Sequence, residues 1–186
     1  MKVLLLNGSP HENGCVFTAL AEVAGTLEKN SVHSEIFWIG SELVRGCIGC
    51  RSCKDVNAGK GCVFKDELYI SLIEKMKESD GPIIGAPVYF AGPLGSLCAL
   101  LDRICFSAGF LFLHKPAACI VNCCRGGASA AFERLKNILR FFKCLWFPVS
   151  TGIPPTGRLR TKFSGIWKDF RLCGLLEQIW PICCIL

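Results

Sequence analysis

The sequence predicts an α/β fold in which a parallel sheet lies between two layers of helices. Apolar, strand-like runs alternate with segments of helical periodicity from residue 3 to residue 122. In addition, the first apolar run breaks into a small polar loop just before a helix. A length of 186 residues suits one domain, so we expect residues 1–186 to form a single unit with a sizeable core.

The alternation indicates four strands and three helices. The expected strands cover residues 3–6, 32–38, 82–88 and 117–122, and the expected helices cover residues 15–29, 66–77 and 92–106. The first strand is a continuous Val-Leu-Leu-Leu run, and the second alternates enough for a strand. The second helix places Leu68, Leu72 and Met76 on one face, and the third has Pro93 near its start, where proline is tolerated. In such a fold crossovers are right-handed, and ligands bind where the strands end.

Residues 7–14, which read Asn-Gly-Ser-Pro-His-Glu-Asn-Gly, join the first strand to the first helix. A helix start offers unpaired N–H groups and the positive end of the helix dipole, so this loop can hold a phosphate. The loop lacks both the triphosphate and the dinucleotide glycine patterns. It suits the single terminal phosphate of FMN, held by the Ser9 hydroxyl, the Asn13 amide and the first helical N–H groups. An ordinary strand-to-helix turn uses the same residue types, so that alternative stays open.

Two further loops follow the third and fourth strands, at the same edge of the sheet. Residues 86–93 offer the aromatic pair Tyr89 and Phe90 on a backbone fixed by prolines, which suits a flat ring. Residues 123–127 offer glycines for close approach, with a cation beside them. Ordinary packing is the alternative for the aromatic pair, but three loops converging on one crevice favour a ligand site.

These motifs resemble the NADPH-dependent FMN reductase branch of the flavodoxin-like superfamily, which includes iron-sulfur flavoproteins. The matching segments are Leu6-Asn7-Gly8-Ser9-Pro10 with Asn13-Gly14, Gly46-Cys47-Ile48-Gly49-Cys50-x-x-Cys53, Ala86-Pro87-Val88-Tyr89-Phe90, Leu101-Asp102-Arg103 and Arg125-Gly126-Gly127. They fall in the family's order within residues 1–135. The resemblance implies a flavodoxin-like three-layer sandwich with strand order 2-1-3-4 and a doubtful fifth strand.

The resemblance also implies a function and a set of site residues. FMN would take electrons from NAD(P)H and pass them to a small molecule, a flavin or a quinone, in a dimer or tetramer. The FMN phosphate would lie on Ser9, Pro10, His11, Asn13, Gly14, Cys15, Val16 and Phe17, and the isoalloxazine would be flanked by Pro87, Val88, Tyr89, Phe90, Gly92, Arg125, Gly126 and Gly127. Similar proteins usually place Thr where this chain has Val16, and the lost hydroxyl would cost about 1.5–3 kcal/mol of phosphate binding. The flavin carries the redox chemistry, so we expect no catalytic acid or base.

A second candidate site is the sequence Cys47-x-x-Cys50-x-x-Cys53, followed by Cys62. Three closely spaced cysteines with a remote fourth are typical of iron-sulfur ligation, because one turn of loop presents three ligands to three cluster corners. Four thiolates also satisfy zinc, and free thiols are the third alternative. The three histidines form no such cluster.

The last fifty-one residues differ in composition from the rest. Residues 1–135 hold thirteen Lys or Arg and thirteen Asp or Glu, whereas residues 136–186 hold eight against two and carry the whole net charge of +6. Back-translated and read from the third nucleotide of each codon, the tail gives strings that resemble the family's own C-terminal segment. We therefore interpret residues 136–186 as the product of a one-nucleotide loss near the Lys136 codon. The fifth strand and last helix would be lost, with residues 141–149 as a substitute strand.

Two function classes follow: a flavin-dependent NAD(P)H oxidoreductase, or an inactive or unstable product of a frameshifted gene that retains at most FMN or metal binding. The start does not resemble a signal peptide, and no uncharged apolar window is long enough to suggest a membrane span. We expect a cytoplasmic protein whose fourteen cysteines stay reduced. If residues 136–186 result from a frameshift, their positive charge is no evidence for binding to nucleic acid or to a membrane. We therefore expect neither as a partner.

Overall fold

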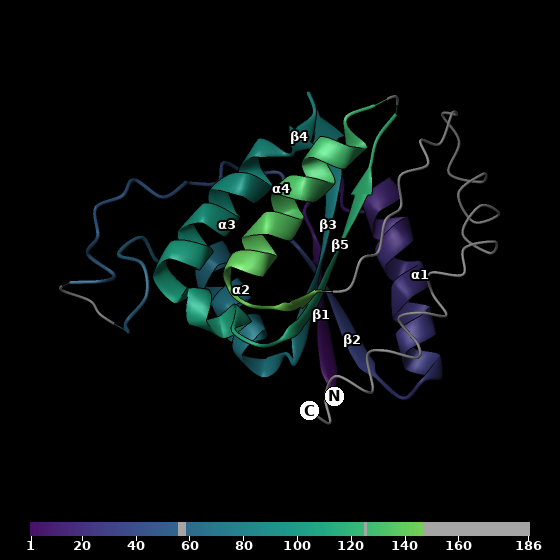
Figure 1. Cartoon of the computed structure of the whole chain (residues 1–186), viewed down its shortest axis with the longest axis horizontal. Helices are drawn as coiled ribbons and strands as arrows, with labels where there is room; N and C mark the ends of the chain where they lie inside the picture. Colours follow the sequence, from purple (N-terminus) through teal and green to yellow (C-terminus); the bar gives the residue numbers. More distant parts are fainter. Residues whose placement is uncertain (56–58, 125, 147–186) are drawn as a thin grey trace.

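The computed structural model describes residues 1–55, 59–124 and 126–146, which fold around one central sheet (Figure 1). The strands are β1 (Lys2–Asn7), β2 (His33–Trp38), β3 (Gly81–Tyr89), β4 (Gly92–Pro93), β5 (Pro116–Asn122) and β6 (Leu145–Trp146). The helices are α1 (Cys15–Lys29), α2 (Glu67–Glu78), α3 (Gly95–Ala108), the 3-10 helix η1 (Gly109–Phe112) and α4 (Ala128–Phe141). The predicted α/β class is confirmed.

The strand order is β2-β1-β3-β5-β6, and every pair along this path is parallel. This order confirms the prediction, since β5 is the fourth strand expected from the sequence. The fifth position is taken by β6, beside Pro116 and Ala117. Of the proposed substitute strand, residues 145–146 form β6, whereas Phe141 is the last residue of α4 and residues 147–149 lie outside the described residues.

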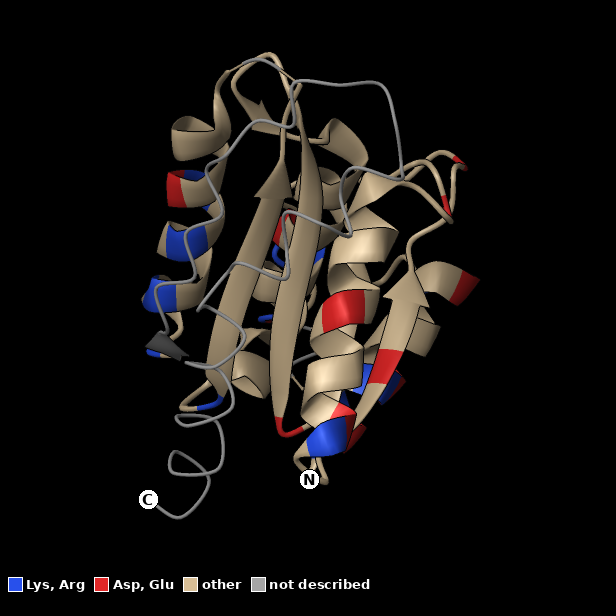
Figure 2. Ribbon diagram, turned by 90° about the vertical axis from the view of Figure 1, so that its right-hand side faces the viewer, with Lys and Arg blue, Asp and Glu red and all other residues tan. Residues whose placement is uncertain are grey.

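Helices cover both faces of the sheet, with α1 on one side and α2, α3 and α4 on the other (Figure 1). Successive strand residues point to opposite faces, so Leu4 and Leu6 of β1 pack under α2 and α3 while Val3 and Leu5 pack under α1. The sequences of β3 and β5 contain no charged residue, and Figure 2 shows the central strands free of charge. A strand buried on both faces has no place for a solvated side chain.

The segment Gly95–Phe112 is the one described helix that is long and apolar enough to cross a membrane by length and composition. It contains Asp102 and Arg103, and 56% of it is buried inside the protein. Leu97, Leu101 and Ile104 are among its residues that pack in the core against α2 and the sheet, whereas Phe106 and Phe110 are exposed.

Helix α4 continues without a break through the start of the compositionally distinct tail. Leu135 and Leu139 are both 0% exposed, and the ring of Phe142 stacks on Phe112 with centroids 5.7 Å apart. The i, i+4 spacing of Leu135 and Leu139 keeps them on one face of the helix. The first residues of the tail therefore contribute to the core, with Leu139 and Cys144 buried.

Candidate functional site

The loop of residues 8–14, here called the phosphate loop, lies against the core at the carboxyl end of β1. The Gly8 N–H donates to the Gly85 carbonyl of β3 at 2.8 Å. A Cβ atom at Gly8 would lie 2.7 Å from that oxygen and 2.5 Å from a methyl carbon of Leu97, so only glycine allows this approach. The phosphate loop is thereby set directly over the boundary between β1 and β3, where the strand order reverses.

Asn7, at the end of β1, closes the phosphate loop from beneath. It is fully buried, its Oδ1 accepts from the Ser9 N–H at 3.2 Å, and its Nδ2 donates to the Glu12 carbonyl at 2.9 Å. The indole N–H of Trp38, at the end of β2, donates to the Ser9 carbonyl at 2.8 Å. Sequence reasoning missed both supporting roles, because neither residue type identifies such a contact without the strand order.

Among the described residues, the Ser9 hydroxyl accepts a hydrogen bond but donates none. The residue is 4% exposed, and its Oγ accepts from the His11 N–H at 3.1 Å, which leaves the hydroxyl proton available. Helix α1 begins after Gly14, which provides no side-chain cap, and the first turn holds no acidic residue. The first N–H groups of α1 thus lack a side-chain acceptor, as an anion site at a helix start requires.

The other predicted phosphate-site residues, in the phosphate loop and the first turn of α1, differ in exposure, and Pro10, Gly14 and Phe17 are half-buried. His11, Asn13 and Cys15 are exposed, so they are available to a ligand. Val16, by contrast, is 2% exposed and packs into the core, where one of its methyl carbons would lie 2.7 Å from a Cβ atom placed on Gly85. The prediction that residue 16 bears on the phosphate through its side chain is therefore corrected: the Val16 side chain faces β3.

Residues 89–92 form a tight hairpin between β3 and β4, with Tyr89 paired to Gly92. The two residues at its tip, Phe90 and Ala91, have positive φ angles of 47° and 62°. Two-residue hairpins of this kind favour Asn-Gly, so Phe-Ala at the tip is strained. Phe90 is 107% exposed and Tyr89 is 47% exposed, which contradicts ordinary core packing for this pair.

The third loop meets the hairpin. Gly127 precedes α4 with a φ of 86°, and a Cβ atom there would lie 2.7 Å from the Cα of Ala91. Gly126 beside it is exposed, and Arg125 lies outside the described residues. Pro87 and Val88, in β3, lead into the hairpin, and Pro87 pairs in register with Asn122 of β5.

Asn122 ends β5 with an unused acceptor. Its Oδ1 atom is buried and has no hydrogen-bond partner among the described residues. A buried amide oxygen without a donor is costly, and such atoms mark places where a ligand supplies the missing bond. Sequence analysis treated Asn122 only as the end of a strand.

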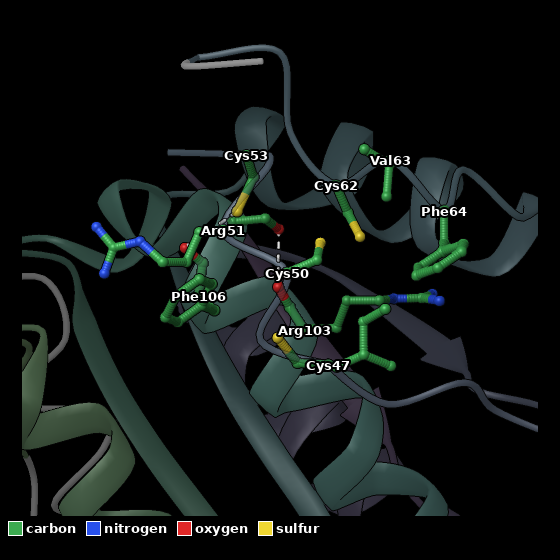
Figure 3. A pocket seen from close by; sticks show the side chains of 11 residues that line it. Cys47, Cys50, Arg51, Cys53, Cys62, Val63, Phe64, Arg103 and Phe106 are labelled. Atoms are coloured by element: carbon green, nitrogen blue, oxygen red, sulfur yellow. Dashed lines mark hydrogen bonds between the residues drawn. The ribbon is translucent and has the colours of Figure 1, made fainter. Parts of the chain in front are cut away.

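The four cysteines of the second candidate site line one pocket, together with Arg103 and Phe106 of α3 (Figure 3). Cys47 and Cys50 are exposed, whereas Cys53 and Cys62 are buried. Burial raises the pKa of the Cys53 thiol above its ordinary value. Among the described residues, no three His, Cys, Asp or Glu side chains form a group that could hold a metal ion as they stand.

A polar network supports this pocket from α2 and α3. Asp66 caps α2 by accepting from the Tyr69 N–H at 3.0 Å and also pairs with the guanidinium of Arg103. Burial raises the pKa of the Asp66 carboxyl, but the hydrogen bonds from Arg103 and Tyr69 more than offset this and hold the pKa below its usual range. The Tyr69 hydroxyl accepts from the Cys62 N–H at 3.0 Å and lies 2.8 Å from the Ser107 hydroxyl.

The raised pKa values of two buried thiols outside the pocket, Cys119 and Cys144, lead us to expect that stability depends on pH. Burial raises the pKa of Cys119 to about 12 and that of Cys144 to about 11, from an ordinary value of 9.0. The unfolded chain therefore loses these protons first, so their stabilising effect is complete below pH 9.0 and is lost as the pH rises toward the folded values.

We accordingly expect the urea concentration at half-unfolding to decrease as the pH is raised from about 8 to about 11. Cys119→Ala should make that decrease smaller. A fall of the same size in the variant would contradict the assignment to Cys119. Cys15, which is exposed, provides the control substitution, and Cys15→Ala should leave the fall unchanged.

Comparison with known proteins agrees with this geometry. The chain matches the family model for NADPH-dependent FMN reductases over residues 1–153. It is 31% identical to an iron-sulfur flavoprotein of Methanocaldococcus jannaschii over 140 residues, or 74% of this chain and 70% of that protein. An iron-sulfur flavoprotein of Archaeoglobus fulgidus is 36% identical over 55% of this chain and 48% of its own length. One from Clostridioides difficile is 24% identical over 93% of this chain and 79% of its own length.

Solved structures share the fold at low sequence identity. The NAD(P)H:(acceptor) oxidoreductase FerB of Paracoccus denitrificans has a TM-score of 0.66 and 17% identity, with 95% of this chain and 93% of that chain covered. RosB with a bound riboflavin-phosphate intermediate has a TM-score of 0.70 and 16% identity, with 96% and 76% covered. Both are flavin-associated proteins on the same parallel sheet. The chain therefore belongs to the NADPH-dependent FMN reductase family and has the flavodoxin-like fold.

Proposed function

We propose that this chain is a flavoprotein oxidoreductase that binds FMN and takes electrons from NAD(P)H. The observation that carries the proposal is the phosphate loop, where a buried serine hydroxyl and an uncapped helix start lie together over the switch point of the sheet. When bound, FMN accepts a hydride and passes electrons on singly or in pairs. The family match over residues 1–153 supports the same cofactor.

The residues of this chain would hold FMN in three ways. Ser9 and the first N–H groups of α1 would bind the phosphate as hydrogen-bond donors. The exposed aromatic rings of Tyr89 and Phe90 offer stacking surface for the isoalloxazine. Asn122 offers its unpaired Oδ1 to a ligand N–H, and the isoalloxazine carries such a donor between two carbonyls. The strained hairpin would be retained because it presents these rings.

We propose further that Cys47, Cys50, Cys53 and Cys62 ligate one metal centre and that this centre is a four-iron cluster. The four thiols line a common pocket, and three closely spaced cysteines with a remote fourth are typical of iron-sulfur ligation. A single zinc ion held by four thiolates is the alternative. The names of the archaeal relatives lend support.

The proposal is tested by purifying the chain without oxygen and reconstituting it with FMN, iron and sulfide. We expect a yellow-brown protein that oxidises NADPH or NADH. A protein that retains no FMN would contradict the flavin site, and one that retains FMN but no iron would contradict the metal centre alone. Cys62→Ser should lose the iron and keep the FMN, whereas Cys98→Ser, at a half-buried cysteine of α3 outside the pocket, should keep both.

The setting and partners of the reaction are proposed on the same basis. A small molecule, a flavin or a quinone would accept the electrons, because the exposed Phe90 and Tyr89 leave the ring site open to a planar acceptor. The described cysteines are all free thiols, which suits the cytoplasm. A dimer or tetramer is proposed from the family alone. Gel filtration of the reconstituted protein tests the oligomeric state.

An inactive product of a frameshifted gene remains the alternative for the tail. Leu139 and Cys144, which follow the proposed change at Lys136, are nonetheless buried in the core. The Clostridioides difficile relative aligns over 93% of this chain, so its alignment also continues past residue 136. Resequencing the locus around the Lys136 codon tests the alternative, which predicts one additional nucleotide there.

A further inference from the structure

Arg103, on α3, is a buried cation that shares the pocket of the four cysteines. Its side chain is 1% exposed, and it lines the same pocket as Cys47, Cys50, Cys53 and Cys62 (Figure 3). A guanidinium stays charged in proteins, so its burial is costly unless negative charge and hydrogen bonds compensate it.

The described residues supply only part of this compensation. Nη1 of Arg103 lies 2.6 Å from Oδ2 of Asp66, Nη2 lies 3.0 Å from Oδ1, and the guanidinium lies 4.9 Å from the centroid of the Tyr69 ring. The Asp66 side chain is 46% exposed, so water weakens its effect on the cation. Nε of Arg103 is buried and has no hydrogen-bond partner among the described residues. Arg103, which lines the cysteine pocket, therefore has an Nε–H without an acceptor and a positive charge that Asp66 neutralises only in part.

We propose that Arg103 is the buried countercharge of an anionic thiolate centre in this pocket and that it raises the reduction potential of that centre. The inference rests on the metal centre of the proposed function and assigns a role to a residue that is not a ligand. Asp66 positions the guanidinium through a hydrogen bond to Nη2 and a close ion pair with Nη1, and Arg103 lines the pocket that holds the thiolates.

The physical reason is charge. Four thiolates around a four-iron cluster give the centre a net negative charge, and reduction adds one electron without making or breaking a bond. The reduced centre is thus more negative by one charge, and a nearby cation stabilises it more than the oxidised centre. The burial of Arg103 strengthens this effect, because a buried charge is screened less than one in water.

Four variants separate the charge of Arg103 from its structural role. Arg103→Met removes the charge and leaves Asp66, which water can solvate. Asp66→Asn removes the opposing charge, and asparagine still caps α2 through its side-chain oxygen. Arg51→Met removes a cation that lines the same pocket but whose side chain is 69% exposed and paired with Asp55. Arg103→Lys keeps the charge and serves as the conservative variant.

The measurement is the midpoint potential of the reconstituted full chain, titrated with a reductant and followed by the electron paramagnetic resonance signal of the reduced cluster. We expect Arg103→Met to make reduction at least tenfold less favourable, which is about 59 mV for one electron. Asp66→Asn should shift the potential upward, Arg103→Lys should stay near the parent, and Arg51→Met should shift it by less than Arg103→Met.

Each outcome decides the inference. An unchanged potential in Arg103→Met overturns the inference. A downward shift in both Arg103→Met and Asp66→Asn also overturns it, because equal shifts from opposite changes of charge indicate disturbed structure. If Arg103→Met does not fold, Asp66→Asn decides alone, and a potential that fails to rise overturns the inference. If the parent chain takes up FMN but no iron, the metal centre of the proposed function fails and the inference falls with it. An iron-loaded parent whose potential ignores both substitutions contradicts the inference only.

Discussion

Replacing Ser9 with Asp is expected to abolish FMN retention. The Ser9 side chain is buried under the uncapped start of α1, so a carboxylate there would face the phosphate across a short, poorly solvated distance. Two charges about 4 Å apart at an effective dielectric constant of about 20 repel by about 4 kcal/mol, which corresponds to a nearly thousandfold weaker complex. Fluorescence titration of the metal-free protein with FMN measures the dissociation constant.

The control adds the same charge at the other end of α1. Ser31 is exposed and has a φ of 59°, a conformation that Asp tolerates well. Ser31→Asp should therefore bind FMN like the parent. Parental affinity in Ser9→Asp would mean that the phosphate does not lie on the phosphate loop.

Replacing Leu139 with Ala is expected to cost about 2–5 kcal/mol of unfolding free energy, the range for a buried leucine whose loss leaves a cavity. Leu139 is 0% exposed near the end of α4 and belongs to the core between that helix and the sheet. Urea denaturation followed by circular dichroism gives the change in midpoint and slope.

Phe141 lies two residues further along α4 and is 81% exposed, so Phe141→Ala removes a larger side chain from the surface. We expect it to change the unfolding free energy by at most about 0.5 kcal/mol. Equal effects of the two substitutions would show that the end of α4 is not docked in solution. Residues 136–144 would then behave as a sequence foreign to this fold.

The sequence predicted the fold well because the signals that determine it are local. Each strand expected from an apolar run is present, and α1 has the expected bounds of 15–29. The order of the strands follows from right-handed crossovers once the alternation is known. The hairpin strand β4 was missed, because Phe90 and Ala91 adopt positive φ angles that their residue types disfavour. No propensity signals a turn that tertiary structure enforces.

The candidate sites were predicted in part, for reasons of the same kind. The grouping of the four cysteines in one pocket was predictable from their spacing, because three of them lie close together on a single loop. The roles of Asn7, Trp38 and Asn122 depend on which strands end side by side, and those of Asp66 and Arg103 depend on how α2 packs on α3. The side chain of Val16 faces the core, which a helix start alone does not specify, while its backbone N–H is among the first of α1.

The hydrogen bonds of Asn7, Ser9 and Trp38 have a consequence for the kinetics of cofactor uptake. They tie the phosphate loop to β1 and β2 with bonds that contain no cofactor atom, so the ordering entropy of the loop is met during folding. Binding then loses only the freedom of the incoming molecule, as in any preorganised receptor. A colourless chain should therefore already hold the Ser9 and His11 amide protons against exchange with solvent, and FMN should associate in a single concentration-dependent phase without a slower rearrangement.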